Sequence, residues 1–285
     1  GIARFIVGLA KKVLIANTVA ATADQLFGLP LAQLDAGRAW LGVTCYTLQI
    51  YFDFSGYSDM AIGLGRLFGF RFPENFSWPY AADSVQRFWR RWHMSLSAWF
   101  RDYVYVPLGG SRRSPLRTYV NLVAVFFLCG LWHGESCTFV VWGLFHGLFL
   151  VLERLGLATF IDRLPRPLRH TYVMLVVMVG WVFFRADSFS HAVGWLAALA
   201  GAGGAAPAPL SISWYLTPEL MLALIAGCVG SAPIVPAINS WLTSPSDRPN
   251  RLREAAALAA LAVLFAVSVV QVAAGTYNPF IYFRF

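Results

Sequence analysis

Several stretches of this 285-residue chain are apolar for long enough to cross a lipid bilayer, and this feature constrains the fold more than any other. A membrane-spanning helix needs roughly 20 mainly apolar residues, whereas a soluble core helix is shorter and keeps one polar face. The sequence therefore predicts an all-α, polytopic membrane protein. The apolar runs that we expect to span are 39–54, 119–132, 139–152, 172–184, 219–241 and 254–274.

The composition agrees with this interpretation and limits the alternatives. Hydrophobic residues make up 58% of the chain and charged residues 13%, and the mean hydropathy is +0.59. A soluble domain has roughly 45–50% apolar and about 25% charged residues. The net charge is +8, but the basic residues lie in short connections between apolar runs. Connections rich in Lys and Arg tend to stay on the cytoplasmic side of a membrane, and this rule explains the positive charge better than nucleic-acid binding does.

Other segments are predicted to be helical without being clean spans. Residues 9–21 form a short apolar helix, and 192–201 is too short to cross alone. Residues 55–76 mix apolar residues with glycines and charges, which indicates a broken or re-entrant stretch. In 83–106, Trp and Arg recur at helical spacing, which is typical of a helix at the membrane interface.

The distribution of arginine predicts the orientation. Arg-rich connections occur at 112–117, 154–169 and 248–253, and the segment 186–247 contains neither Lys nor Arg. Alternate connections therefore separate by charge. We expect the Arg-rich connections to be cytoplasmic, and residues 186–218 to face outward.

Several familiar kinds of site are missing from the sequence. It contains no nucleotide-binding P-loop and no Gly-x-Ser-x-Gly elbow. No group of His, Cys and Glu has metal-ligand spacing, so we expect no metal site. The cysteines lie in or beside apolar runs and are expected to be small buried residues. They are Cys45, Cys129, Cys137 and Cys228.

His133 is the sharpest candidate for chemistry. It ends the apolar run that follows Arg117, which places it about 24 Å from the Arg-rich edge and deep in the membrane. An imidazole can act as a general base because its pKa lies near neutral pH. Gly130 and Gly134 remove bulk beside it, so that a chain or a ligand could approach. A histidine hydrogen-bonded between helices explains the residue equally well.

The other histidines have a weaker case. His93 lies on the Trp- and Arg-rich segment, and by itself it is better explained as an interfacial polar residue. His146 lies within an apolar run, where a structural role is favoured. His170 and His191 lie in connections and have no functional case.

Charged residues in apolar runs are costly and need partners. Asp53 and Asp59 lie in or beside a predicted span, and we expect the arginines of the 87–101 segment, Arg90 and Arg91 among them, to pair with them. Buried ion pairs are usually structural, and breaking one costs about 3–5 kcal/mol. The expected role of these four residues is therefore to hold the fold.

Six short motifs include or surround these positions: 51–63 (YFDFSGYSDMAIG), 70–76 (FRFPENF), 88–97 (FWRRWHMSLS), 101–110 (RDYVYVPLGG), 130–134 (GLWHG) and 277–280 (YNPF). In these motifs the sequence resembles the membrane-bound O-acyltransferase (MBOAT) family, specifically its alginate O-acetyltransferase branch. The teichoic-acid D-alanylation branch shares some of these elements but differs after Arg-Asp-Tyr, where Val106-Pro107-Leu108-Gly109-Gly110 fits the acetylation branch.

The resemblance implies a ring of tilted helices, with interfacial and re-entrant helices, around a central pore. It implies that His133, in its Trp-His-Gly context, is the essential catalytic residue, and that His93 is a second functional position. Trp132, Gly134 and Trp92, beside these histidines, are the expected substrate-binding residues. Residues 1–285 would be one membrane-embedded acyltransferase domain, the C-terminal part of a longer protein.

The function that this resemblance implies is O-acetylation of an exported polysaccharide such as alginate, in the bacterial inner membrane. The donor would be acetyl-CoA or an acyl-carrier thioester on the cytoplasmic side, with no bound cofactor. A periplasmic or extracellular acetyltransferase and the polysaccharide would be its partners. Peptidoglycan O-acetylation and teichoic acid D-alanylation stay open as alternatives. So does a non-enzymatic transporter or channel, although the sequence lacks the repeated halves expected of one.

Overall fold

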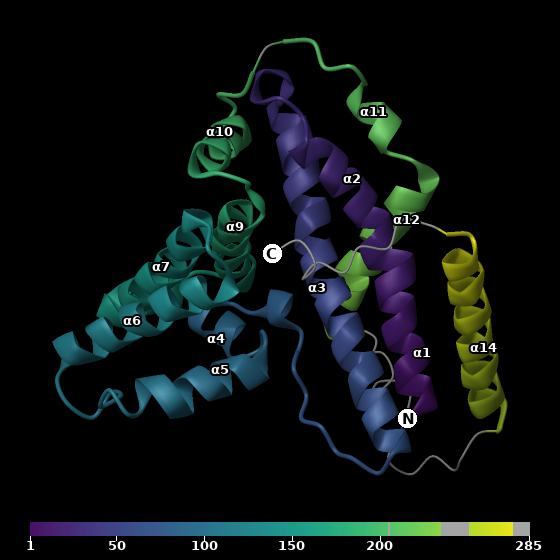
Figure 1. Ribbon diagram of the computed structural model, residues 1–285, viewed down its shortest axis with the longest axis horizontal. Helices are drawn as coiled ribbons and strands as arrows, with labels where there is room; N and C mark the ends of the chain where they lie inside the picture. The colour runs from purple at the N-terminus through teal and green to yellow at the C-terminus, as the bar shows by residue number, and fades with distance from the viewer. Residues whose placement is uncertain (205, 235–250, 276–285) are drawn as a thin grey trace. The chain divides into compact units, whose positions relative to one another are not determined.

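The computed structural model describes residues 1–204, 206–234 and 251–275, and every regular element in those ranges is helical (Figure 1). The longer elements are α1 (Ile2–Ala10), α2 (Asn17–Phe27), α3 (Ala36–Leu67), α6 (Pro115–His133), α7 (Cys137–Leu152), α9 (Arg166–Arg185), α10 (Phe189–Leu199), α12 (Pro218–Gly230) and α14 (Arg251–Ala273). The shorter α-helices are α4 (Val85–Trp89), α5 (Met94–Phe100), α8 (Ala158–Ile161) and α11 (Ile212–Tyr215). The 3-10 turns are η2 (Leu31–Gln33) and η3 (Pro79–Ala81), and the π-helical turns are η1 (Lys11–Ala16), η4 (Arg101–Tyr105) and η5 (Glu153–Leu157).

Five helices in the described ranges are long and apolar enough to cross a membrane, which confirms an all-α, multi-pass membrane protein. The first is much longer than the predicted helix at 9–21, because the π-helical turn η1 continues the helical path instead of ending it. Of the predicted span 219–241, only α12 is described before residue 235. The five helices are Ile2–Phe27, Pro115–His133, Cys137–Ile161, Arg166–Arg185 and Arg251–Ala273. The helix α3 contains the predicted run 39–54 but is not one of these five.

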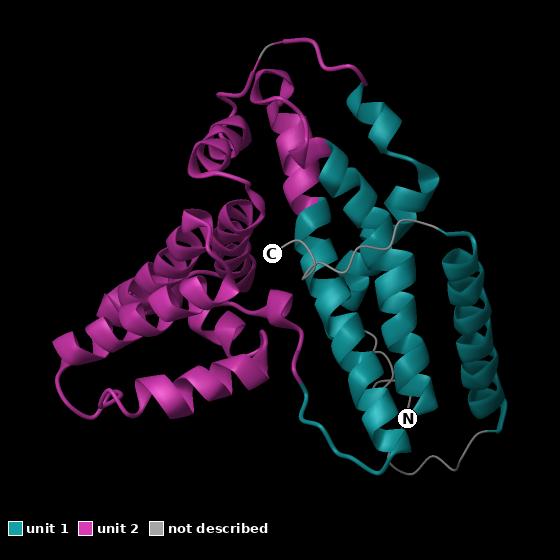
Figure 2. Cartoon of the chain, in the orientation of Figure 1, with its two compact units in different colours: residues 1–25, 45–74, 211–284 teal, residues 26–44, 75–210, 285 magenta. Residues whose placement is uncertain are grey.

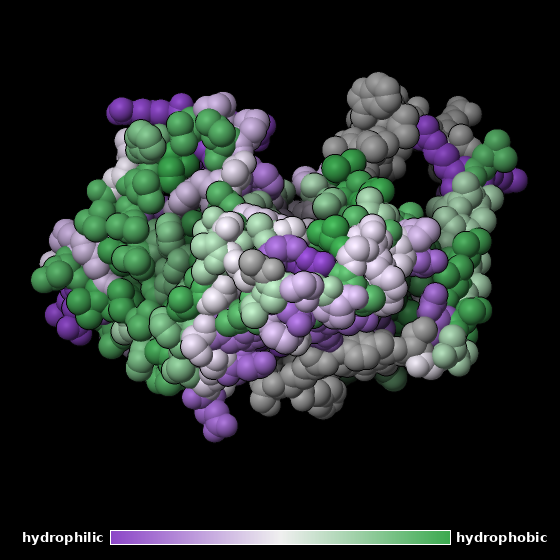
Figure 3. All heavy atoms as spheres, turned by 90° about the horizontal axis from the view of Figure 1, so that it is seen from above, coloured by the Kyte–Doolittle hydropathy of each residue, from purple (hydrophilic) through white to green (hydrophobic). Residues whose placement is uncertain are grey.

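The surface of these helices is apolar where a soluble protein would be polar. In α14, only 6% of the most apolar stretch is buried inside the protein. Apolar side chains cover much of the face seen in Figure 3, and polar residues gather in separate patches. Long apolar helices that leave their side chains exposed need lipid around them.

The prediction of a broken stretch at 55–76 is wrong over most of its length, since α3 runs unbroken to Leu67. Its glycines serve close helix packing. A Cβ at Gly56 would lie 2.8 Å from the carbonyl oxygen of Gly8, and one at Gly63 would lie 2.8 Å from the amide nitrogen of Phe5. The absence of side chains therefore lets α1 and α3 approach each other closely.

The predicted interfacial helix at 83–106 is interrupted. It consists of α4, α5 and η4, because the chain turns at positions 90–93. Ser84 caps α4 by accepting a hydrogen bond from the amide of Arg87 at 3.1 Å. His93 then adopts a left-handed backbone conformation, with φ of 44°. A non-glycine residue adopts that conformation only where its surroundings enforce it.

The chain forms two compact units (Figure 2). Unit 1 contains residues 1–25, 45–74 and 211–284, and unit 2 contains 26–44, 75–210 and 285. A ring of helices around a pore depends on how the two units are placed together, so it stays a prediction.

Ion pairs within the membrane helices hold unit 1 together. Asp53 lies 2.5 Å from the ammonium of Lys12, and its side chain is 1% exposed. Asp59 lies 2.6 Å from both Arg4 and Lys11, and Arg4 also bonds Glu74. The prediction that Asp53 and Asp59 pair with the arginines of 87–101 is therefore wrong. Their partners are on α1 and η1, and Gly8 of α1 lets α3 pack tightly against these helices.

An aromatic core holds unit 2 together. Trp142 and Trp181 are both 1% exposed and stack with ring centroids 6.2 Å apart. Phe88 is fully buried and stacks on Trp92 at 5.6 Å. Lipid is as apolar as these side chains, so their close packing rather than their transfer from water stabilises the unit. This core fixes the turn that bears His93 against α7 and α9.

Candidate active site

A cavity of about 750 Å³ lies within unit 2 and brings His93 and His133 together. His93 comes from the turn between α4 and α5, and His133 from the end of α6. Side chains from α4, α5, α6 and η4, with Leu150 of α7, form the other walls. The lining residues include Gln86, Trp89, Arg90, Trp92, His93, Leu122, Cys129, His133 and Leu150.

The ring of His133 is held by aromatic packing. Its centroid lies 5.0 Å from that of Trp142, 5.1 Å from that of Phe184 and 4.9 Å from that of Trp132, in edge-to-face arrangements. In the described part of the chain no group gives this imidazole a hydrogen bond. The ring is therefore fixed in place by neighbours that leave its nitrogens to whatever enters the cavity.

The two glycines that flank His133 make room for the neighbouring helix. A Cβ at Gly130 would lie 3.0 Å from the Cα of Val140, and one at Gly134 would lie 2.7 Å from the ring of Phe139. Of the two uses that we expected, approach by a chain or by a ligand, the structure gives approach by a chain. Gly130 and Gly134 position His133 by letting α6 and α7 pack closely.

A hydrogen-bond network determines which tautomer His93 adopts. Its Nδ1 lies 3.2 Å from Oδ1 of Asn75, and that same oxygen accepts from the amide and the hydroxyl of Ser95, at 3.2 and 3.0 Å. The amide of Ser95 can only donate, so it orients the Asn75 oxygen towards the ring; we therefore assign the proton to Nδ1, which also lies 3.4 Å from the hydroxyl oxygen of Ser95. The remaining nitrogen, Nε2, then offers a lone pair and acts as an acceptor.

Burial also controls the charge of His93. Removal from solvent lowers the pKa of this imidazole to about 4, from an ordinary value of 6.5. The ring is therefore neutral near pH 7. A neutral ring that donates a hydrogen bond from Nδ1 to Asn75 can accept a hydrogen bond from a ligand at Nε2. It contributes no positive charge to the cavity.

The structure brings together some of the other predicted site residues but not all of them. Trp92 lines the cavity and is 5% exposed, and Arg90 lines it as well. Trp132 and Gly134 are not among the lining residues, and Trp132 is 55% exposed. Arg91 is not among the lining residues, and its backbone carbonyl accepts a hydrogen bond from the amide of Ser77 at 3.1 Å.

His146 lies behind the cavity wall. It is fully buried, its ring centroid is 5.0 Å from Trp89 and 5.5 Å from Trp142, and neither ring nitrogen has a hydrogen-bond partner in the described residues. The absence of a side chain at Gly180 makes the space for the ring. His146 is not among the residues that line the cavity, so it reaches substrate only through other side chains.

Two further residues, Asn75 and Glu153, position the site and were not among the predicted ones. Asn75 lies within the motif at 70–76, but nothing in the sequence around it indicates a contact with His93. Glu153 is 5% exposed, and its carboxylate accepts from the backbone amides of Val85 and Gln86 at 2.7 and 2.9 Å. A carboxylate at the end of an apolar run was the available signal.

A second cavity of about 310 Å³ adjoins the first. Gln86, Leu122 and Leu150 line both cavities. Its other walls include Arg87 and Arg154, which belong to Arg-rich parts of the sequence. The histidine cavity is therefore next to a cavity whose walls carry both basic and acidic side chains, Arg87, Arg154, Glu153 and Asp162.

The site offers no cluster of metal ligands. In the ranges 1–204, 206–234 and 251–275, no group of three or more His, Cys, Asp or Glu side chains could hold a metal ion. The chemistry available from the residues present is that of two imidazoles in a largely apolar, aromatic-walled cavity.

Comparison with known proteins places this site in a family. The family model described as the membrane-bound O-acyltransferase family matches residues 1–190, which include both histidines. The chain is 42% identical over 313 aligned residues to a probable alginate O-acetylase of Azotobacter vinelandii, covering all of this chain and 62% of that protein. It is 39% identical over 331 aligned residues to its counterpart in Pseudomonas aeruginosa, covering 63% of that protein.

Relatives with other named activities match shorter parts. A peptidoglycan O-acetyltransferase of Helicobacter pylori is 42% identical over 74% of this chain and 40% of its own length. A teichoic acid D-alanyltransferase of Bacillus subtilis is 34% identical over 37% of this chain and 28% of its own. The chain spans between 61% and 64% of the length of the alginate O-acetylases that cover it completely. The all-helical membrane fold, the paired histidines and these matches together establish that the chain belongs to the membrane-bound O-acyltransferase family.

Proposed function

We propose that this protein is a membrane O-acetyltransferase that moves an acetyl group from a cytoplasmic thioester donor across the membrane, for O-acetylation of an exported polysaccharide such as alginate. The observation that carries the proposal is that His93 and His133, far apart in the sequence, line one cavity. The names of the full-length relatives support acetyl transfer to alginate in particular.

In the mechanism that we propose, His133 is the general base. A hydroxyl group attacks the carbonyl carbon of the thioester while His133 takes its proton, and the proton then passes to the departing thiolate. A positioned base typically contributes about 10²–10⁴-fold to such a step. Aromatic packing on several sides of His133 supports this role, because it fixes the ring without engaging its nitrogens. An acetyl-imidazole relay uses the same geometry and stays an alternative.

His93 is proposed to orient the donor. A histidine at this position has two possible roles, orienting the thioester or polarising its carbonyl. Polarising a carbonyl requires a donated hydrogen bond, and the Asn75 network commits the Nδ1 proton elsewhere. The lone pair at Nε2 can accept a hydrogen bond from an N–H or O–H group of the thioester substrate, or from the hydroxyl group that receives the acetyl group. Asn75 would then act on the reaction through His93, as a positioning residue.

The direction of transfer follows from the charge distribution. We propose that the Arg-rich connections, with the charged cavity at Arg87 and Arg154, face the cytoplasm of a bacterium with this protein in its inner membrane. The wall shared by the two cavities would give an acetyl-CoA or acyl-carrier thioester a route to His133. The acceptor side would be the outer one, where a periplasmic or extracellular acetyltransferase and the polysaccharide would take over the acetyl group.

The proposal treats residues 1–285 as one membrane-embedded acyltransferase domain with no bound cofactor. Trp92 is the predicted substrate-binding residue that the cavity supports, and the roles of Trp132 and Gly134 are to hold His133. Other acceptors, peptidoglycan or teichoic acid with D-alanine as the acyl group, stay as alternatives since relatives with those names match part of the chain.

A release assay separates this enzyme from a transporter. The full-length protein, purified and reconstituted in vesicles, is given acetyl-CoA or an acetylated acyl carrier, and the free thiol is measured. We expect thiol release that depends on an added hydroxyl acceptor and is lost in His133→Ala. A passage of solute across the vesicle membrane without any thiol release would support the transporter and end the proposal.

A further inference from the structure

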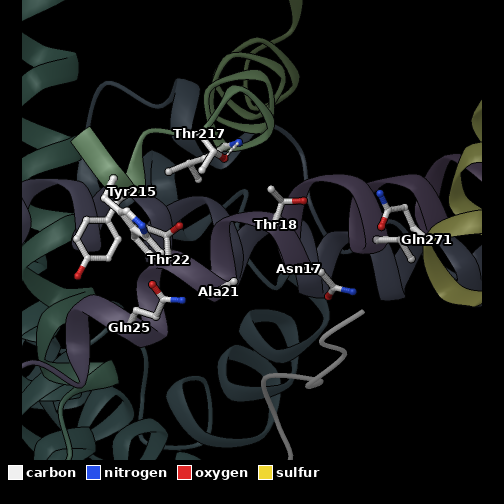
Figure 4. Close-up of a pocket in the computed structure, with 11 residues that line it drawn as sticks. Asn17, Thr18, Ala21, Thr22, Gln25, Tyr215, Thr217 and Gln271 are labelled. Carbon is white, nitrogen blue, oxygen red and sulfur yellow. Dashed lines mark hydrogen bonds between the residues drawn. The ribbon is translucent and has the colours of Figure 1, made fainter. Parts of the chain in front are cut away.

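Another pocket, of about 380 Å³, lies within unit 1 and is not part of the histidine site. Figure 4 shows its walls, which come from η1, α2, the α11–α12 segment and α14. Its volume falls in the range of small-molecule sites, roughly 300–1,000 Å³. The lining residues are Val13, Asn17, Thr18, Ala21, Thr22, Gln25, Trp214, Tyr215, Thr217, Leu220 and Gln271.

The chemistry of this lining is unusual for a membrane protein. None of its described residues is an Asp, Glu, Lys or Arg, yet most of them carry an amide or a hydroxyl group. Two aromatic residues complete the wall: Tyr215, which is buried, and Trp214, which is 54% exposed. A surface meant only for lipid would carry apolar side chains, and a site for an ion would carry charges.

Asn17 provides the observation that points to a ligand. Its side chain is nine-tenths buried, and its Oδ1 has no hydrogen-bond partner among the described residues. An unpaired buried acceptor costs about 1–3 kcal/mol unless something donates to it. Asn17 directly follows the π-helical turn η1, and π-turns are frequent at functional sites because they redirect side chains.

The neighbouring hydroxyls define what the pocket can bind. Thr18 donates its own proton to the carbonyl of Leu14 at 3.0 Å, so it offers acceptor lone pairs. Thr217 accepts from the amide of Leu220 at 3.2 Å and donates its proton to the carboxylate of Glu219, so towards a ligand it offers a lone pair. The side-chain amides of Asn17 and Gln25 supply N–H donors, and a ligand with several hydroxyl groups satisfies both kinds of group.

We propose that this pocket binds one ring of an uncharged saccharide, with its hydroxyls on Asn17, Thr18 and Thr217 and its apolar face on Trp214. A carboxylate-bearing sugar fits less well, because none of the described lining residues supplies a cation for its charge, and burying an unpaired charge is costly. The ring could belong to a free oligosaccharide or to a glycolipid headgroup. With the orientation proposed above, the segment 211–217 lies at the outer surface, where either would be encountered.

The test measures binding to the full-length protein in lipid nanodiscs by saturation-transfer NMR. The probes are cellotetraose, which is neutral, a mannuronate tetramer of equal length, and nanodiscs that contain glucosyl-diacylglycerol. We expect saturable binding of cellotetraose or of the glucosyl headgroup, and weaker binding of the mannuronate tetramer. Binding of cellotetraose assigns a free chain as the source, and binding of the glucosyl lipid alone assigns the headgroup.

Variants connect the binding to this pocket. Asn17→Leu and Trp214→Ala should each weaken binding about tenfold, the effect of losing one neutral hydrogen bond or a comparable ring contact. Trp214 is half exposed, so its replacement tests the pocket without disturbing the fold. Thr18→Val is compared with Thr171→Val, because Thr171 makes the same bond to its own helix at 3.0 Å but lies outside the pocket. The control should bind normally.

The proposal fails if neither neutral probe binds, if Trp214→Ala and Asn17→Leu bind as well as the parent protein, or if the mannuronate tetramer binds more tightly. His133→Ala should bind the saccharide normally, since the pocket shares no residue with the histidine cavity. A failure of the acetyltransferase proposal and a failure of this one therefore give different results.

Discussion

Replacing Glu153 should destabilise the protein more than any exposed carboxylate would. This side chain is 5% exposed, and it accepts from the amides of Val85 and Gln86, at 2.7 and 2.9 Å, and from the hydroxyl of Tyr172 at 3.3 Å. The two amides belong to the first turn of α4, where backbone donors have no partner within the helix. Glu153 thus ties the helix that carries Trp89 to the end of α7.

The size of the effect follows from counting these donors. A buried donor left without an acceptor costs about 1–3 kcal/mol, so Glu153→Ala, which strands both amides, should cost about 2–6 kcal/mol. Glu153→Gln keeps one acceptor oxygen and should cost about half as much. Tyr172→Phe removes the longest bond together with its donor, so its cost should be about 1 kcal/mol or less.

The assay heats the detergent-purified protein and uses size-exclusion chromatography to measure how much stays folded at each temperature. The abundance of each variant in membranes is measured as well. Since domains are stable by only about 5–15 kcal/mol, Glu153→Ala should lose a large part of its folded yield. Glu254→Gln, at an exposed position of α14, is the matched control and should unfold with the parent protein. If Glu153→Ala unfolded at the same temperature as this control, the capping role assigned to Glu153 would be refuted.

Three further predictions concern orientation, ion pairs and pH. A cysteine near Gly203 should react with an impermeant reagent from outside, and one near Arg166 from the cytoplasm; the reverse pattern would overturn the orientation. Asp53→Asn should reduce folded protein at least as much as activity per molecule, because it weakens the pair with Lys12; a variant of normal abundance without activity would contradict this. Burial lowers the pKa of His93 to about 4, so the unfolded chain binds its proton more readily, and stability should fall as the pH drops from about 6.5 to 4. His93→Gln should lack this part of the pH dependence, as measured by unfolding at each pH.

The sequence alone was enough to predict those features of the protein that do not depend on packing between distant segments. Runs of apolar residues predicted the helical membrane fold, and motif resemblance selected His133 and His93, which the structure places in one cavity. Both inferences rest on local patterns, the length of a run or the residues beside a histidine. The structure adds that Trp142 and Phe184 hold His133 and that Asn75 sets the tautomer of His93.

The failures came from interactions between distant segments. The glycines of 55–76 looked like helix breakers, but Gly56 and Gly63 are contact points for α1, which no local rule reveals. The partners of Asp53 and Asp59 were sought among arginines with a strong sequence signal, whereas the structure pairs them with Lys12 and Arg4. Glu153 escaped notice because its partners are backbone amides, which have no sequence signature. The predicted C-terminal motif at 277–280 lies outside the described residues.

Acetylation by a His133→Ala variant tests the central claim most directly. The variant is expressed in cells that lack any homologue, its membrane abundance is matched to the parent protein, and acetyl esters on the exported polymer are measured. The account predicts that acetylation is abolished at nearly unchanged abundance, that His93→Ala is severely impaired, and that His146→Ala retains more activity than either. Acetylation by His133→Ala at a rate comparable to the parent protein would contradict the catalytic assignment and the enzyme proposal that rests on it.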